Sequence, residues 1–427
     1  MKGDEVSSSH SHPTGSGPGA VGCPHFPFEA PADPLDLPEV HRALQDAGPV
    51  SKVMLPPGQP DTEAWLVTGH AEALRVYRDD DTFSRAAADG VRPFLKAAPI
   101  IIALDGEHHR RVRGLVSAGF TPRMVARSRA AIKDLAVELL DEMIGAGEPG
   151  DLAEGWATRY TLAVIARQFD LPPADYPQFR AWSEAVVSVD PEHQAQAPAA
   201  MEAMVGYAAG LLPARAENPG EDLLSLIATN AVASGVDLAE AGLLAVSLVV
   251  GGWETTAGAL VSGVHRLLTT TDEDGHTLYS RLCAEPELIP TAVEEVLRSV
   301  PNSVLGATQP RRATRDVELG GVLVREHEIV IPSPDSAGRD PKAFDDPERV
   351  DLARNPNPHL AFGSGPHMCI GAHLGRVELQ VAFEVLTSRL PGLRLAVPVG
   401  ELDWRFDLSV IRRPARYPVA WTPPVTR

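Results

Sequence analysis

The spacing of hydrophobic positions changes twice along the chain. Short apolar runs bounded by glycine and proline, which are typical of strands, occupy residues 48–55, 64–69 and 317–324. From about residue 108 to residue 282, apolar residues instead recur at intervals of three and four, which predicts amphipathic helices such as RAAIKDLAVELLDEMIGAG (129–147). A final helix is predicted over 370–389, before a β-like C-terminus.

These elements predict a mainly α (α+β) fold, in which a helical body carries small β-sheets at one side. Residues 26–427 are predicted to form a single large domain, because the sequence shows no period of 20–50 residues and few glycine-rich linkers. Residues 1–25 are rich in Ser, Gly, Pro and His and have little to bury, which predicts a disordered tail. They also lack the charged start and apolar stretch of a signal peptide.

Composition and charge narrow the classes of partner. The 427 residues are 44% hydrophobic and 22% charged, and no apolar run approaches the roughly 20 residues of a membrane span. The net charge of −19 is spread along the chain and would repel nucleic acid. Three widely separated cysteines (Cys23, Cys283 and Cys369) fit neither a disulfide framework nor a Cys-x-x-Cys zinc site. A cytoplasmic protein without a membrane or nucleic-acid partner is therefore expected.

Cys369 lies in an unusual setting, FGSGPHMCIGAHLGR (362–376). Gly363, Gly365 and Gly371 allow tight turns and a close approach of the backbone to a bulky ligand. The cysteine stands at the entrance of a predicted helix, where amide N–H groups and the helix dipole stabilise a thiolate. Such a thiolate is either a nucleophile or a metal ligand.

The loop alone leaves several interpretations open. His367 and His373 are near enough in sequence to serve a nucleophilic Cys369 as a base, or to join it in a zinc site. A buried, inert cysteine is a further alternative.

The segment VVGGWETTAG (249–258) interrupts an apolar helix with a glycine pair and an acid. The hydroxyl of Thr255 can bond the carbonyl of Gly251 four residues earlier, which loosens the helix and opens a groove. Glu254 beside Thr255 then offers an acid and an alcohol, a plausible path for protons. The alternative is an ordinary helix with packing glycines.

Two further segments carry spaced charges. In AVEEVLRSV (292–300), Glu295 and Arg298 share one helical face, as surface pairs commonly do. In LDGEHHRRVRGLVSAGF (104–120), His109 and Arg113 share a face that could hold carboxylates of a cofactor. The neighbouring pair Arg110–Arg111 points elsewhere and could meet an acidic protein, although a solvated charged face is the simpler interpretation.

In their residues and in their order along the chain, these segments resemble the cytochrome P-450 family of haem-thiolate monooxygenases, in its soluble bacterial form. The basic helix comes first, then Gly-Gly-x-Glu-Thr-Thr, Glu-x-x-Arg and Phe-Gly-x-Gly-x-His-x-Cys-x-Gly. The similarity runs from about Phe26 to Trp421 and includes FTPR, RRATRDVELGG and NPHLAFG. The cysteine signature is highly specific, whereas Glu-x-x-Arg alone is weak.

The resemblance implies a haem b buried between two central helices, with Cys369 as the axial thiolate of its iron. Phe362 would pack beside the haem and the sulfur, and the loop glycines, Gly363 and Gly371 among them, would let amides bond the sulfur. By family position, the propionate ligands would be His109, Arg113, Arg311 and His359. Glu254 and Thr255 would deliver protons for splitting dioxygen. Glu295 and Arg298 would form a buried structural pair bracing the cysteine loop, with Arg349 as a third member.

The resemblance further implies an oxidoreductase that hydroxylates a small, largely apolar organic molecule with dioxygen and two electrons, in natural-product biosynthesis. With no dinucleotide fingerprint of its own, the chain would take electrons from an iron–sulfur ferredoxin and its NAD(P)H reductase, docked on Arg110–Arg111. A monomer is expected. The expected substrate contacts are Arg92, Gly252, Trp253, Leu305 and Val410.

Two rival functions remain at this point. The same haem chemistry could couple aromatic or indole rings, by C–C or C–N bonds, or form a new ring, without inserting oxygen. A non-catalytic haem sensor or carrier is the rival from another class, and the Glu254–Thr255 pair argues against it. The departures from the common family pattern are Trp253, Gly338, Ser364, His373 and Gly375, and none of them removes a reacting group.

Overall fold

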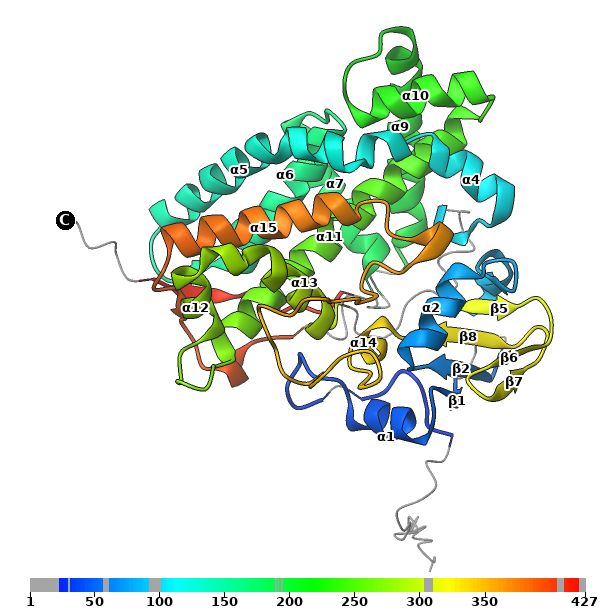
Figure 1. Cartoon of the computed structure of the whole chain (residues 1–427). Coiled ribbons are helices and arrows are strands. Elements are labelled where there is room, and N and C mark those ends of the chain that lie inside the picture. The colour runs from blue at the N-terminus through cyan, green and yellow to red at the C-terminus, as the bar shows by residue number, and fades with distance from the viewer. Residues whose placement is uncertain are drawn as a thin grey trace, which may run out of the picture.

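The computed structural model of the chain describes residues 23–29, 31–56, 61–91, 101–188, 190, 192, 195–302, 310–404 and 411–421. A large body of helices lies beside a smaller β region at one end (Figure 1). This arrangement confirms the predicted mainly α, α+β class. The predicted tail falls largely on residues 1–22, which lie outside the described residues, and its boundary with the domain stays a prediction. The carbonyl of Pro24 already accepts a hydrogen bond from Met54 N at 2.8 Å.

The helices supply most of the structure. In chain order they are α1 (Glu39–Ala47), α2 (His70–Arg78), α4 (Gly106–Gly114), α5 (Pro122–Gly145), α6 (Thr158–Gln168), α7 (Tyr176–Val187), α9 (Ala197–Glu217), α10 (Leu223–Ser234), α11 (Leu238–Thr269), α12 (Leu278–Ala284), α13 (Ile289–Ser299), α14 (Pro334–Ala337) and α15 (Ala372–Arg389). A short π-helical segment, η4 (Leu152–Ala157), leads into α6. The helices predicted over 129–147 and 370–389 correspond to α5 and α15.

The β region holds a mixed five-stranded sheet and a hairpin, while a separate three-stranded sheet packs on the helical body. In spatial order the large sheet is β1 (Val50–Met54), β2 (Glu63–Val67), β8 (Ile329–Pro332), β5 (Arg311–Ala313) and β3 (Phe83–Ser84). The small sheets are β4 (Gly150–Asp151), β10 (Pro418–Ala420) and β9 (Arg394–Leu395), and the hairpin β6 (Val317–Leu319) and β7 (Val322–Val324). β1 and β2 pair antiparallel with Val50 opposite Val67, whereas β2 and β8 run parallel.

Helix α11 runs through the centre of the helical body. Its 32 residues are apolar on most sides, and it packs against α6, α9, α10 and α15. By length and composition alone α11 could cross a membrane, but 72% of its most apolar window is buried inside the protein. A helix that is hydrophobic all round and buried in this way is a core helix. The side chain of Asp237 caps its start by accepting a hydrogen bond from Ala239 N at 2.8 Å.

Helix α15 packs beside α5 across the face of the helical body (Figure 1). Arg129 of α5 joins the two helices, since it bonds Gln380 at 3.3 Å and forms an ion pair with Glu384. At the other end, α2 lies on the β region, where Val67, Val76 and Val330 share one hydrophobic cluster. The loop that precedes α15 is therefore held between the helical body and the β region.

Candidate active site

Two glycines with positive φ angles shape the loop before α15. Gly363 has φ +66° and Gly365 has φ +71°, a region that L side chains rarely adopt. A Cβ atom on Gly365 would lie 2.6 Å from the carbonyl oxygen of Tyr77, so only glycine lets the loop dock on the end of α2. The N–H of Cys369 donates to the carbonyl of Phe362 at 2.8 Å and closes the loop.

Cys369 combines exposure to solvent with a dense surrounding of protein atoms. The residue is exposed to solvent, yet surrounding protein atoms desolvate it and raise the pKa of the thiol. The N–H of Gly371 and the cations Arg113 and Arg376 oppose this shift because they favour the thiolate. A thiol that solvent reaches although protein atoms surround it lies on the wall of a recess. A metal ion bound in that recess would deprotonate the thiol.

Buried donors without partners lie near this loop. Arg311 on β5 is fully buried, and its Nε and Nη2 have no hydrogen-bond partner within the described part of the chain. The Nδ1 atom of His109 on α4 is likewise buried and unpartnered among the described residues. Arg113 Nη2 donates to the carbonyl of Met368 at 2.6 Å, but no described carboxylate pairs with it. Buried cations without a counter-ion are costly, so this set favours an anionic ligand.

His367 belongs to the same group, although the sequence suggested it only as a base or zinc ligand. Its ring lies 4.0 Å from that of His109, centroid to centroid, and its Nε2 contacts Asp105 Oδ1 at 3.2 Å. Burial lowers the pKa of His367 to about 3 and that of His109 to about 4, so both rings are neutral at neutral pH. Asp105 thereby fixes the orientation of His367. The spacing of His367 two residues before the cysteine was the available signal.

His359 is placed differently from the prediction. Its Nε2 contacts Glu294 Oε2 at 3.0 Å, and its Nδ1 accepts a hydrogen bond from the N–H of Ala361 at 3.2 Å. Both ring nitrogens are thus occupied by protein atoms, which leaves none for a propionate. His373 is exposed on α15, and the described residues bring no metal-ligand group together from Cys369, His367 and His373.

These residues fit a haem. A soft thiolate on a glycine loop suits iron. The donors of His109 and Arg311 that lack partners among the described residues, with the cation of Arg113, suit the two carboxylates of the porphyrin. The recess would place the thiolate and these donors around one group.

Helix α11 is mostly buried, but Gly251 and Thr255 form a stripe on it that solvent reaches. Gly251 is exposed and Thr255, one turn later, is half-buried, while Trp253 and Glu254 between them are buried. The hydroxyl of Thr255 donates to the carbonyl of Gly251 at 2.5 Å, as its spacing predicted. The stripe is open to a ligand on this side of the helix.

Glu254 points away from this stripe into a buried charge network. Arg413 donates from Nε to Glu254 Oε1 at 2.9 Å and from Nη1 to Glu154 Oε1 at 3.3 Å. Arg180 of α7 continues the chain of charges, binding Glu154 at 2.5 Å and Glu184 at 2.8 Å. Burial raises the pKa of Glu254 and Arg413 opposes the rise. Sequence reasoning missed this network, because its members are far apart in the chain.

Glu295 and Arg298 form an ion pair that is fully buried. Arg298 donates from Nε to Glu295 Oε2 at 2.8 Å and from Nη2 to Oε1 at 2.7 Å, and neither side chain is exposed. Arg298 also donates to the carbonyls of Gly338 and Pro347 at 2.8 and 2.7 Å. The pair therefore ties α13 to the segment that leads to the cysteine loop.

The predicted side-chain role of Arg349 is wrong, since Arg354 fills that place. Arg354 Nε lies 3.1 Å from Glu295 Oε2. Arg349 contributes its carbonyl, which accepts from Arg298 Nη2 at 3.1 Å, while its exposed side chain pairs with Asp351. The two arginines lie five residues apart in one turn-rich segment, which the sequence pattern did not resolve.

The predicted substrate contacts on α11 do not face the stripe. Trp253 is fully buried and donates from Nε1 to the carbonyl of Thr158 at 3.1 Å. A Cβ atom on Gly252 would lie 3.0 Å from Ile165 Cδ1. Both positions therefore pack against α6, and the exposed Gly251 is the better candidate. The remaining predicted contacts, Arg92, Leu305 and Val410, lie outside the described residues.

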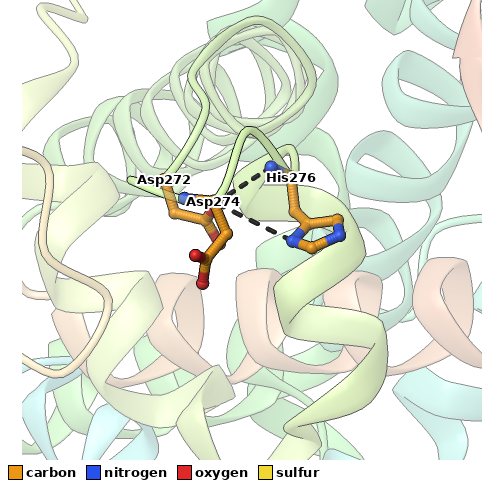
Figure 2. A group of neighbouring side chains, drawn as sticks. All are labelled: Asp272, Asp274 and His276. Carbon is orange, nitrogen blue, oxygen red and sulfur yellow. Dashed lines mark hydrogen bonds and ion pairs between the residues drawn. The ribbon is translucent and has the colours of Figure 1, made fainter.

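A second cluster of ligand-type side chains lies in the surface turn between α11 and α12. Asp272, Asp274 and His276 point toward one another there (Figure 2). Asp272 Oδ1 accepts hydrogen bonds from the N–H groups of Asp274 and His276 at 3.1 and 2.9 Å. These bonds build the turn, so local folding accounts for the cluster.

Comparison with known proteins agrees with this geometry. The family model "Cytochrome P450" matches residues 280–390, which include the Glu295–Arg298 pair and Cys369. Nocardicin C N-oxygenase of Nocardia uniformis subsp. tsuyamanensis is 39% identical over 93% of this chain and 98% of its own.

Solved structures extend the likeness to the fold. LnmA, a cytochrome P450 hydroxylase from the leinamycin biosynthetic pathway of Streptomyces atroolivaceus S-140, is 37% identical with a TM-score of 0.83, covering 93% of this chain and 100% of that one. Cytochrome P450mel 107F1, described with biaryl coupling reactivity, is 35% identical with a TM-score of 0.82, covering 91% and 97%. At these identities over nearly the whole length, the chain belongs to the cytochrome P450 family and is an oxidoreductase that uses molecular oxygen.

Proposed function

We propose that the chain is a haem-thiolate monooxygenase in which Cys369 ligates the iron of a haem b. The observation that carries this assignment is the solvent-reached thiol of Cys369 together with buried donors of His109 and Arg311 that lack partners among the described residues, His109 lying against His367 of the cysteine loop. Arg113 and His367 complete the set proposed to hold the haem carboxylates. Phe362 and Gly363 form the start of the loop beneath the sulfur, and Gly371 donates its N–H toward it.

The bound haem supplies the activation of dioxygen with two electrons. The protein's part is to bring protons to the recess and keep bulk water out. Thr255 Oγ1, on the exposed stripe of α11, is proposed to pass a proton toward a ligand there. Although Glu254 points away from the stripe, it is proposed to hold that proton at Oε2, a buried oxygen with no partner among the described residues, while Oε1 stays on Arg413.

The reaction assigned to this site is oxygen insertion into a small, largely apolar organic molecule of a natural-product pathway. Relatives of similar identity, 35% to 39%, are named for N-oxygenation, hydroxylation and biaryl coupling. Coupling of aromatic rings is therefore the second candidate, and the mass of the product separates the two. A gain of one oxygen marks insertion, whereas a dimer or new ring marks coupling. The charge network around Glu254 argues against a haem carrier, which needs no proton delivery.

Electrons are proposed to come from an iron–sulfur ferredoxin and its NAD(P)H reductase in the cytoplasm. Arg110 and Arg111 are exposed on α4, the helix that also carries Arg113. Ferredoxins are acidic, so this basic pair on a chain of net charge −19 is the proposed docking point, on a monomer.

The deciding experiment is the absorption spectrum of the purified, haem-loaded protein after reduction under carbon monoxide. A strongly red-shifted Soret band in the parent, lost in Cys369→Ser, is expected for thiolate ligation. Failure of the folded parent to bind haem would overturn the assignment. Substrates can then be screened by spin-state shifts, with product mass as the final readout.

A further inference from the structure

Arg376 and Glu294 form a two-point ion pair beside the cysteine loop. Arg376, in the second turn of α15, lies with Nε 2.8 Å from Glu294 Oε1 and with Nη2 2.9 Å from Oε2. A bidentate pair of this kind fixes the plane of the guanidinium. Glu294, on α13, also contacts His359 Nε2 at 3.0 Å and is therefore held from a second side.

The fixed guanidinium lies over the ring of Phe362. Its Cζ is 4.6 Å from the ring centroid, within the roughly 6 Å of a cation–π contact. The carbonyl of Phe362 accepts the hydrogen bond from Cys369 N at 2.8 Å. A Cβ atom on Gly375 would lie 3.8 Å from the ring, so the ring lies along α15. Arg376 thus holds the residue that closes the thiolate loop.

The pair also sets the charge beside the cysteine loop. Two cations contact this loop, since Arg376 lies over the ring of Phe362 and Arg113 Nη2 donates to the carbonyl of Met368 at 2.6 Å. Arg113 has no carboxylate partner among the described residues, whereas the charge of Arg376 is balanced by Glu294. Replacing either member of the balanced pair by a neutral residue changes the local net charge by one unit, and the two replacements act in opposite directions.

We propose that Arg376 and Glu294 are positioning residues that set the one-electron reduction potential of the cofactor bound to Cys369. The inference rests on the proposed haem-thiolate function. Reduction of ferric to ferrous iron by one electron adds one negative charge to the site. Arg376 favours that charge and Glu294 disfavours it, and the balanced pair keeps the potential between the two extremes.

The test uses four variants of the haem-loaded protein, titrated with dithionite while the Soret band is followed. Glu294→Gln leaves Arg376 unbalanced and raises the midpoint potential. Arg376→Gln leaves Glu294 unbalanced and lowers it. The double variant returns close to the parent, because the net charge is restored. Arg376→Lys keeps the charge but loses the bidentate ion pair with Glu294. Its reduction potential therefore stays near that of the parent, while its denaturation midpoint falls.

A purely structural brace would behave differently. It would lower the denaturation midpoint in both single variants and again in the double one, without any reversal of sign in the potential. Single variants whose potentials are unmoved, or move in the same direction, overturn the proposal. If the reduced carbon monoxide spectrum of the parent shows thiolate-ligated haem, that failure concerns this pair alone. A parent without such a spectrum overturns both this proposal and the proposed function.

Discussion

Arg413 donates from Nε to Oε1 of Glu254 across 2.9 Å, and 8% and 6% of the two side chains are exposed. The same guanidinium also reaches Glu154 at 3.3 Å. One buried cation is thus shared between two carboxylates, so the proton affinity of Glu254 depends on how that cation is divided. Burial raises the pKa of Glu254, and Arg413 works against the rise.

Changing how Arg413 is shared between Glu254 and Glu154 is expected to shift the pH above which electron use is no longer coupled to product formation. In Arg413→Gln, Glu254 loses its counter-ion, its pKa rises further, and it keeps its proton to higher pH. In Glu154→Gln, Arg413 pairs with Glu254 alone, which lowers the pKa of Glu254 and moves the limit to lower pH. Product formed per NAD(P)H, measured against pH, checks both shifts. Glu142→Gln is the control, because Glu142 pairs with the exposed Arg159 at 2.6 Å, outside the network; shifts of the same sign in the first two variants would contradict the role.

Thr255→Ala is expected to divert reducing equivalents into peroxide. The hydroxyl lies on the exposed stripe of α11, and its loss removes the last proton donor before the recess. Positioned acid–base groups contribute about 10²-fold or more, so product formation should fall by at least that factor while haem binding is unchanged. The matched control is Thr256→Ala, because Thr256 makes the same type of bond, to Gly252 at 2.9 Å. Equal peroxide yields from the two variants would remove Thr255 from the proton path.

Arg311→Leu is expected to affect the haem-free and haem-loaded protein in opposite directions. Without haem, the variant removes a buried cation whose Nε and Nη2 lack partners among the described residues, so the denaturation midpoint rises. With haem, the carboxylate loses its cation and haem is transferred to apomyoglobin faster. Arg312→Leu on the same strand is the control, since Arg312 already pairs with Asp61 at 2.8 Å. A lower midpoint in haem-free Arg311→Leu would show that the cation is paired already.

Sequence patterns predicted the elements that depend on local periodicity. The apolar spacing that indicated a helix over 129–147 appears as α5, and the run AWLVTG contains most of β2. The parallel pairing of β2 with β8 was not predictable, because it joins Trp65 to Val330 across most of the chain. Such register depends on tertiary packing rather than on local preference.

For the candidate site, motif spacing predicted proximity but not side-chain direction. Trp253 was expected to meet substrate, yet it stands two residues from both Gly251 and Thr255, a rotation of about 200° along a helix, which turns it toward Thr158 on α6. The partner of Glu254 was missed for a related reason. Arg413 comes from a segment 159 residues later, and no sequence pattern links the two.

Charge reversal at Arg110 and Arg111 is expected to slow reduction by ferredoxin. Both side chains are exposed on α4, so their substitution should leave substrate-induced spin shifts unchanged. Loss of electrostatic steering lowers the association rate and weakens its dependence on salt. Stopped-flow reduction at low and high ionic strength measures both effects. Arg416→Glu is the control, because Arg416 is exposed beside Asp151 of β4. Reduction rates equal to those of the parent would place the docking surface elsewhere.

Arg298→Ala is expected to cause the largest loss of stability among these variants. Its guanidinium makes two bonds to Glu295 and further bonds to the carbonyls of Gly338, Pro347 and Arg349. Removing it leaves the buried carboxylate of Glu295 with Arg354 as its remaining cation, and breaking a buried pair costs about 3–5 kcal/mol. The midpoint of urea denaturation, followed by the Soret band, measures the loss. Arg349→Ala keeps the carbonyl that Arg298 uses and removes only an exposed side chain, so its midpoint should stay close to that of the parent. A comparable fall in both variants would mean that the side chain of Arg349 supports the loop after all.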